Sequence, residues 1–132
     1  MEGGQTNEFR PLILVAEDDD SSFKLIKAII GKKCDIQWAK NGEEIVALFK
    51  EYGNEAKAIL MDIKMPVMNG LDATKIIRGE NKEIPIIMQT AYAFSSDKEN
   101  AMNAGASEVL VKPITLSILR NTLTKYFPEL VW

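Results

Sequence analysis

The sequence predicts an α/β fold in which short parallel strands alternate with amphipathic helices. Short apolar runs recur along the chain, and the stretches between them carry apolar residues at helical spacing, which is the pattern of consecutive strand–helix units. With 132 residues the chain fits one domain, and its 46% hydrophobic content suffices for a core of that size. Four of the apolar runs also end in a polar residue where a strand should give way to a loop. These runs are Leu12–Ala16, Ala58–Met61, Ile84–Gln89 and Val109–Val111.

The first strand–helix unit follows residues 1–10, which we expect to be a flexible lead-in or linker remnant. After the strand Leu12–Ala16, either Asp20 or Ser21 can cap a helix that should end near Gly31. The apolar residues of this helix fall on one face: Phe23, Ile26, Ile29 and Ile30.

The second unit begins where Cys34, Ile36 and Trp38 alternate with polar neighbours, as in a short strand. Asn41-Gly42 then supplies a turn before a helix. The apolar face of that helix carries Ile45, Leu48 and Phe49. Cys34 is the only cysteine, so we expect a small buried hydrophobic side chain and no disulfide within the chain.

The third and fourth units follow the strands Ala58–Met61 and Ile84–Gln89. Gly79 marks the expected end of the third helix, and Gly105 that of the fourth. Leu71, Thr74 and Ile77 set the buried face of the third helix. The segment 95–97, Ser-Ser-Asp, can cap the fourth helix.

The fifth unit completes the fold with the strand Val109–Val111 and a last helix for which Thr115 is a suitable cap. The expected apolar stripe of this helix consists of Leu116, Leu119, Leu123 and Tyr126.

Composition excludes several classes of function. A net charge of −3 argues against nonspecific electrostatic binding to nucleic acid or anionic lipid, so the expected partners are proteins and cations. The sequence contains no apolar run long enough for a membrane span, and its start resembles no signal peptide, which indicates a soluble, cytoplasmic protein without membrane contact. Histidine is absent, which excludes histidine-based catalytic sites, histidine metal sites and a phosphohistidine carried by this chain.

The polar residues after the apolar runs should meet at one edge of the sheet, because the carboxyl ends of parallel strands share an edge where ligands bind. They are Glu17-Asp18, Asp62, Thr90 and Lys112. Carboxylates about 5 Å apart would repel by about 3 kcal/mol per pair, so such a cluster must bind protons or a cation. Carboxylate oxygens without His or Cys favour Mg²⁺, with Mn²⁺ as the alternative.

This constellation resembles the receiver domain of two-component response regulators, including those of chemotaxis. The segment from Asp62 to Gly70 has the family's D-x-x-M-P-x-M-x-G form, and Thr-Ala and Lys-Pro follow at receiver spacings. The resemblance extends from about Leu12 to Phe127. It implies a flavodoxin-like (βα)5 sheet with strand order 2-1-3-4-5, in a receiver domain at residues 11–128 followed by a tail at 129–132.

The resemblance also implies roles for the site residues. Asp62 would accept a phosphoryl group from the phosphohistidine of a histidine kinase or histidine phosphotransfer protein. Glu17, Asp18 and Asp62 would hold Mg²⁺ together with the backbone carbonyl of Lys64. Lys112, followed by a cis proline bond, would neutralise phosphoryl charge, while Thr90 would bond a phosphoryl oxygen and so switch a surface for a downstream protein. We expect weak self-dephosphorylation, no direct contact with nucleic acid, and a monomer or weak dimer.

Two departures from the family pattern bear on output. Val109 stands three residues before Lys112, where an aromatic switch residue is common, so backbone movement from Ala91 to Ser96 should exceed side-chain movement at Val109. Lys64 and Tyr92 lie two residues beyond Asp62 and Thr90, where they are expected to tune the lifetime of the phosphoryl group.

Alternatives from other classes fit less well. A stand-alone phosphatase of the dehalogenase-like type needs a second Asp where this chain has Lys64, and it needs a cap domain. A degenerate receiver would lack part of the acidic, Thr and Lys set, and a flavin-binding flavodoxin needs a phosphate loop after the first strand. The sequence also leaves open a single-domain regulator or a segment of a hybrid sensor kinase, with the Ala-Glu-Asp motif and both chain ends slightly favouring the segment.

Overall fold

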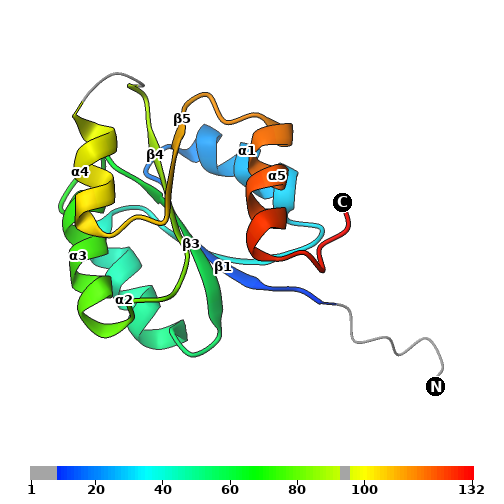
Figure 1. The fold of residues 1–132 in the computed structure, drawn as a ribbon, viewed down its shortest axis with the longest axis horizontal. Helices are drawn as coiled ribbons and strands as arrows, with labels where there is room; N and C mark the ends of the chain where they lie inside the picture. The colour runs from blue at the N-terminus through cyan, green and yellow to red at the C-terminus, as the bar shows by residue number, and fades with distance from the viewer. Residues whose placement is uncertain (1–8, 93–95) are drawn as a thin grey trace.

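A five-stranded parallel sheet with strand order β2-β1-β3-β4-β5 forms the centre of the molecule (Figure 1). The computed structural model describes residues 9–92 and 96–132. The strands are β1 (Leu12–Ala16), β2 (Asp35–Ala39), β3 (Ala56–Asp62), β4 (Ile86–Thr90) and β5 (Glu108–Val111). The order confirms the flavodoxin-like topology that the family resemblance implies.

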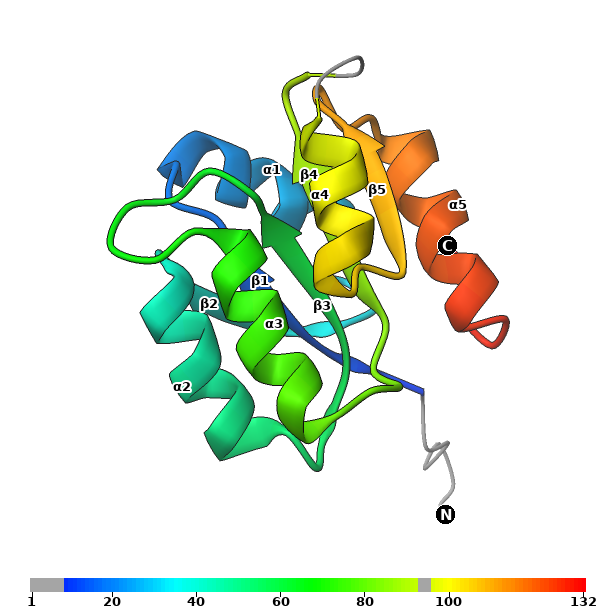
Figure 2. The same ribbon diagram turned by 60° about the vertical axis from the view of Figure 1, so that its left-hand side comes forward.

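Five helices cover both faces of this sheet. They are α1 (Asp20–Ile30), α2 (Gly42–Tyr52), α3 (Gly70–Glu80), α4 (Asp97–Ala104) and α5 (Leu116–Tyr126). Helices α1 and α5 lie on one face, and α2, α3 and α4 lie on the other (Figures 1 and 2). Parallel sheets need this double cover because their connections place helices on both faces.

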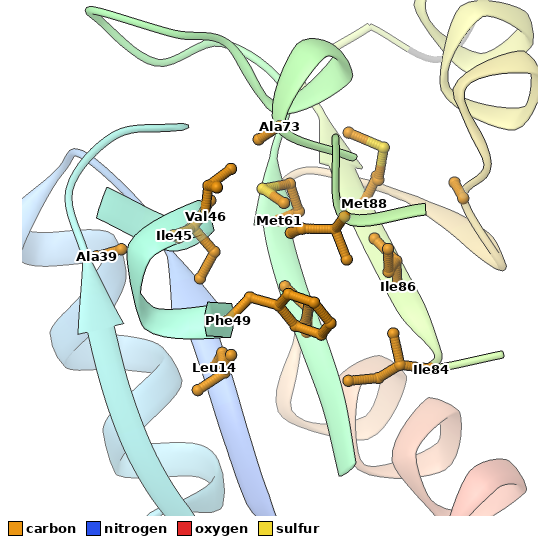
Figure 3. Close-up of a cluster of buried hydrophobic side chains, with 14 of the residues drawn as sticks. Leu14, Ala39, Ile45, Val46, Phe49, Met61, Ala73, Ile84, Ile86 and Met88 are labelled. Atoms are coloured by element: carbon orange, nitrogen blue, oxygen red, sulfur yellow. The ribbon is translucent and has the colours of Figure 1, made fainter. Parts of the chain in front are cut away.

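Side chains that alternate along the strands divide the core into two layers. Leu14, Met61 and Met88 point toward α2 and α3, where they pack around Phe49 and Ile77 (Figure 3). The other layer faces α1 and α5. It includes Ile13, Val15, Leu60, Ile87, Phe23, Ile26, Leu119 and Leu123. Cys34 belongs to this second layer and is buried, as the sequence predicts.

Strand register brings the carboxyl ends of the strands to one edge. Ala16 pairs with Met61 on β3, so Glu17 follows β1 at the level of Asp62. Asp62 in turn pairs with Gln89, and Thr90 pairs with Val111. The residues that follow or close β1, β3, β4 and β5 therefore share this edge of the sheet.

Several element ends differ from the predicted ones. The N-cap of α1 is Asp19, whose side chain accepts the Ser22 N–H at 2.8 Å, while Asp20 and Ser21 lie inside the helix. Asp19 has the extended backbone that a cap requires. Helix α3 continues through Gly79 to Glu80, and its C-cap is Asn81, whose backbone N–H donates to the Ile77 carbonyl.

The ends of the fourth and fifth units show two more differences. Leu116 was expected in the apolar stripe of α5, but it is the first residue of the helix and half exposed, whereas Phe127, just after the helix, is buried. Thr115 caps α5 as predicted. At α4 the N-cap is Ser96, without a side-chain cap bond, and the predicted contribution of Ser95 lies outside the described residues.

The first described residues, Phe9 and Arg10, and the residues after α5 pack at the end of the sheet opposite the strand carboxyl ends. The rings of Phe9 and Phe127 lie 6.1 Å apart, and Arg10 donates to backbone carbonyls at the end of α1. After α5, Leu130 is buried and the Trp132 indole N–H donates to Thr124 Oγ1 at 3.0 Å. Within the described residues, no helix combines the length and apolar character needed to cross a membrane.

Candidate functional site at the carboxyl edge of the sheet

Glu17 follows β1 directly and is fully buried. Its backbone extends the pairing with β2, since the Glu17 N–H donates to the Ala39 carbonyl at 2.9 Å. The Trp38 indole N–H donates to the Glu17 carbonyl at 2.8 Å. On the side chain, Oε2 accepts the Asp19 N–H at 3.1 Å. The carboxylate is thus held in place by the loop that it begins.

Asp62 is the last residue of β3 and is also buried. The chain behind it turns tightly, because the Ile63 N–H donates to Gln89 and the Ile63 carbonyl accepts the Gly70 N–H at 2.8 Å. A Cβ at Gly70 would collide with the Asp62 backbone oxygen. Glycine is therefore required where α3 begins beneath the Asp62 carboxylate.

The loop between Asp62 and α3 contains a strained residue. Val67 has φ 70°, a left-handed conformation that a β-branched residue rarely adopts, and the Met68 N–H donates to the Pro66 carbonyl at 2.7 Å across it. The Met68 carbonyl accepts the Gly42 N–H at 2.8 Å, so α2 holds the loop from outside. Such strain, of the order of 1–3 kcal/mol, persists only where neighbouring contacts fix the backbone.

Lys112 approaches the carboxylates from the end of β5. Its backbone N–H donates to the Thr90 carbonyl at 2.7 Å, and the Lys112–Pro113 bond is cis, as the resemblance implies. The Lys112 Nζ lies 3.2 Å from Glu17 Oε1 and 3.1 Å from Asp62 Oδ2. One ammonium therefore bridges the two buried carboxylates.

The three carboxylates form an electrostatically unbalanced cluster. Carboxylate oxygens of Glu17, Asp18 and Asp62 lie within 4.8 Å of one another. Burial and the neighbouring Asp62 raise the pKa of Glu17 to about 7. Burial also raises the pKa of Asp62, although Lys112 opposes that rise. For Lys112 burial alone would lower the pKa, but the two carboxylates outweigh it and hold the pKa above its usual value.

This donor set fits a hard divalent cation. Three carboxylates face one ammonium, so a bound cation would balance the remaining charge and let Glu17 and Asp62 ionise. All donors are oxygen atoms, which suits Mg²⁺. Asp18 is exposed and can reach an ion that keeps several waters. The carbonyl of Lys64 as a further ligand stays a prediction.

Thr90 closes β4 on the other side of Asp62 and is buried. Its Oγ1 accepts the Tyr92 N–H at 3.1 Å and donates to Asp97 Oδ2 at 3.3 Å, at the start of α4. A pocket of about 100 Å³ opens between Asp62, Thr90 and Lys112. The Lys64 ammonium, from the loop that lines this pocket, lies 4.7 Å from the centroid of the Tyr92 ring.

All five side chains that the sequence singled out meet at this edge, but two supporting residues were missed. Trp38 contacts the Glu17 carbonyl, and Gly42 contacts the loop after Asp62. The sequence offered Trp38 only as a strand residue and Gly42 only as a turn residue. The Trp38 contact comes from the pairing of β1 with β2, and the Gly42 contact from the approach of the start of α2 to the loop after β3. Alternation of apolar residues specifies neither.

Comparison with known proteins agrees with this geometry. The family model described as response regulator receiver domain matches residues 13–124. The chain is 37% identical over 129 residues to hybrid signal transduction histidine kinase I of Dictyostelium discoideum. That match covers 89% of this chain but only 7% of the length of the kinase.

Solved structures show the same fold at similar coverage. The receiver domain of sensor histidine kinase PA1611 from Pseudomonas aeruginosa, with a magnesium ion in its active site cleft, has a TM-score of 0.83 and 29% identity, covering 91% of this chain and 99% of that one. The receiver of Saccharomyces cerevisiae Ssk1, crystallised with the phosphotransfer protein Ypd1, has a TM-score of 0.83 and 28% identity, covering 92% and 93%. This chain belongs to the response regulator receiver domain family of two-component systems.

Proposed function

We propose that Asp62 accepts a phosphoryl group from the phosphohistidine of a histidine kinase or histidine phosphotransfer protein. The observation that carries this proposal is the position of the Asp62 carboxylate. It lies 3.1 Å from the Lys112 ammonium, within reach of two further carboxylates, and at the wall of a pocket that Thr90 also lines. The crystallised complex of the Ssk1 receiver with Ypd1 supports a partner of this class.

In the transfer step an Asp62 carboxylate oxygen attacks the phosphorus of the phosphohistidine. A P–O bond forms, the P–N bond breaks, and the imidazole of the partner leaves with the electron pair. Lys112 stabilises charge on the phosphoryl oxygens from the β5 side. Glu17 and Asp18, with Asp62 and the Lys64 carbonyl, would hold Mg²⁺, or Mn²⁺ in its place, which would supply further positive charge for the phosphoryl oxygens.

The switch would begin at Thr90. Its hydroxyl now bonds Asp97 and the Tyr92 N–H, and turning toward a phosphoryl oxygen would break these two hydrogen bonds. The start of α4 would then rearrange and change a surface for a downstream protein. Val109 on β5 packs against the core on the α3 and α4 side, and its β-branched side chain has few rotamers to exchange.

We further propose that the domain is a signalling module with weak self-dephosphorylation, a monomer or weak dimer in the cytoplasm. Lys64 and Tyr92 contact each other beside the pocket, where they would limit the access of water to the aspartyl phosphate. The lifetime of that ester would then depend on this pair. The pocket beside Asp62 has a volume of only about 100 Å³, which leaves little room for a small-molecule substrate and argues against an efficient phosphatase.

Phosphorylation by acetyl phosphate tests the assignment. In the presence of Mg²⁺, intact-mass spectrometry should detect one added phosphoryl group on the parent and none on Asp62→Asn. Asp72→Asn is the matched control, because Asp72 is an exposed aspartate in the first turn of α3. Equal incorporation by Asp62→Asn and the parent would refute the proposal.

A further inference from the structure

Residue Glu17 is held at both of its backbone groups by strand β2. Its N–H donates to the Ala39 carbonyl at 2.9 Å, and its carbonyl accepts the Trp38 indole N–H at 2.8 Å. The regular ladder between β1 and β2 ends at Ala16 and Ala39. The Trp38 side chain therefore extends the pairing by one residue, into the loop that carries Glu17 and Asp18.

The indole ring of Trp38 is itself fixed from α1 and from its own strand end. The Phe23 ring stacks on it with centroids 4.0 Å apart and an interplanar angle of 1°. The Lys40 ammonium lies 4.8 Å from the ring centroid and pairs with Asp20 at 3.3 Å. Since Phe23 covers one face of the indole, Lys40 must lie over the other.

These contacts enclose the acidic loop between two fixed points. Asp20 and Phe23 lie in the first turn of α1, directly after the loop, and Trp38 holds the first residue of the loop. The same β2–α2 connection reaches the loop after Asp62, because the Gly42 N–H donates to the Met68 carbonyl at 2.8 Å. The segment from Trp38 to Gly42 supplies no carboxylate to the cluster, yet it contacts both the loop that carries Glu17 and Asp18 and the loop that follows Asp62.

We propose that Trp38 is a positioning residue for the divalent cation site, an inference that rests on the proposed function of that site. Its indole N–H orients the peptide between Glu17 and Asp18 and so keeps both carboxylates directed at the ion. The alternative is that Trp38 has a purely structural role and only packs against Phe23. The two differ in what happens when the N–H is removed and the aromatic ring is kept.

Substitution Trp38→Phe makes that change. In metal-free protein, the Asp18 amide, which shares a peptide with the Glu17 carbonyl, should shift in ¹H–¹⁵N spectra and exchange faster. The Kd for Mg²⁺, measured from amide shifts, should rise about tenfold, as expected for the loss of an outer contact to a metal ligand. Phosphorylation by acetyl phosphate should recover to the parent rate at saturating Mg²⁺, because the ligands themselves remain.

Trp132→Phe is the matched control, since it also removes an indole hydrogen bond, to Thr124, but at the C-terminal end of the chain. Its Kd for Mg²⁺ should stay within about twofold of the parent value. A Trp38→Phe protein that binds Mg²⁺ as tightly as the parent would overturn the positioning role while leaving the cation site intact. A parent protein that binds no Mg²⁺ would overturn the site and this inference together.

If Trp38→Phe fails to fold, Lys40→Gln decides the question. Lys40 is exposed, and removing its positive charge near an acidic site should by Coulomb attraction alone tighten cation binding. Weaker Mg²⁺ binding in Lys40→Gln would therefore support positioning through the Trp38 ring. Unchanged Asp18 amide signals in metal-free Lys40→Gln would contradict it, because the position of the loop can be read there without the cation.

Discussion

Glu17 is a buried carboxylate whose negative charge is disfavoured by its surroundings. The carboxylate is fully buried, its oxygens are already bonded to Lys112 and to the Asp19 N–H, and the Asp62 carboxylate, which Lys112 also bonds, lies close by. Burial and the Asp62 charge raise the pKa of Glu17 to about 7. Without a cation, the folded state therefore favours the protonated form of Glu17.

Metal-free protein should therefore lose stability as the pH rises. Between the ordinary value of 4.5 and a folded-state pKa of about 7, the folded protein holds a proton on Glu17 that the unfolded chain has released. The free energy of unfolding should fall through this window, by at most about 3 kcal/mol from this group. Urea unfolding in EDTA at pH values from about 5 to about 8 measures the change.

The variant Glu17→Gln isolates this contribution, because it removes the titration and keeps the size of the side chain. Its unfolding free energy should depend less on pH than that of the parent over the same window. Glu43→Gln, an exposed change in the first turn of α2, is the control and should leave the parent slope unchanged. Identical slopes for Glu17→Gln and the parent would show that Glu17 titrates normally.

At the scale of elements, the loop after β3 depends on a close approach that only glycine allows. A Cβ at Gly70 would meet the backbone of Asp62 as well as the Met61 side chain, whereas a Cβ at Gly79, in the same helix, would meet no atom within 4 Å. A side chain is therefore excluded at Gly70 but can be accommodated at Gly79. One shapes the site, and the other only weakens the helix.

Alanine substitutions at these two positions should change stability in opposite directions. Gly70→Ala should lower the free energy of unfolding by more than about 2 kcal/mol, because backbone must move beneath Asp62. Gly79→Ala should raise it by about 0.5–1 kcal/mol, since alanine favours a helix interior. Urea denaturation of both variants tests the pair, and a neutral Gly70→Ala would mean that the loop is looser than its contacts indicate.

Element types were predictable from the sequence because apolar periodicity reports which face of a strand or helix is buried. The buried residues of α1 show this, since Phe23, Ile26, Ile29 and Ile30 all lie in the core as expected. Element ends were less predictable. The sequence offered Asp20 or Ser21 as the cap of α1, but the cap is the preceding residue, Asp19, which has the extended backbone that a cap requires.

The site was predictable in its residue types but not in its contacts. Parallel strands had to place Glu17, Asp62, Thr90 and Lys112 at one edge, and they do. Which groups bond in the absence of ligand depends on loop geometry that spacing does not encode. The sequence could not show that Thr90 faces Asp97, or that Lys112 bridges Glu17 to Asp62.

On the scale of the whole molecule, the two core layers offer different routes for a signal from the site. Thr90 connects to α4 through Asp97, while Lys112 leads through Pro113 and Ile114 into α5. Helix α4 is short, and its buried residues are two alanines, Ala101 and Ala104, so little apolar side-chain surface anchors it in the core. The α4 side should therefore respond more readily than the α5 side.

Beryllofluoride, which stands in for the phosphoryl group on Asp62, should reveal this difference by NMR. Amide signals of Ala91, Tyr92 and Ser96 should move strongly, and the Val109 methyl groups should move little, because valine has few rotamers to exchange. Signals from residues 93–95, outside the described part of the chain, belong to the same segment. A large Val109 change with static Ala91 and Tyr92 amides would reverse the proposed route.

The packing of Phe9 against Phe127 has a consequence for how the domain can be carried in a longer polypeptide. Phe9, the first described residue, packs on Phe127 just after α5, and the Trp132 indole N–H donates to Thr124 within α5, so both ends of the described chain are held beside α5 and not by the loops next to Glu17 and Asp62. If the domain is part of a longer polypeptide, neighbouring modules that join it at these ends would leave the carboxyl edge of the sheet uncovered. The length and identity of such modules could then vary without blocking the access of a partner protein to Asp62.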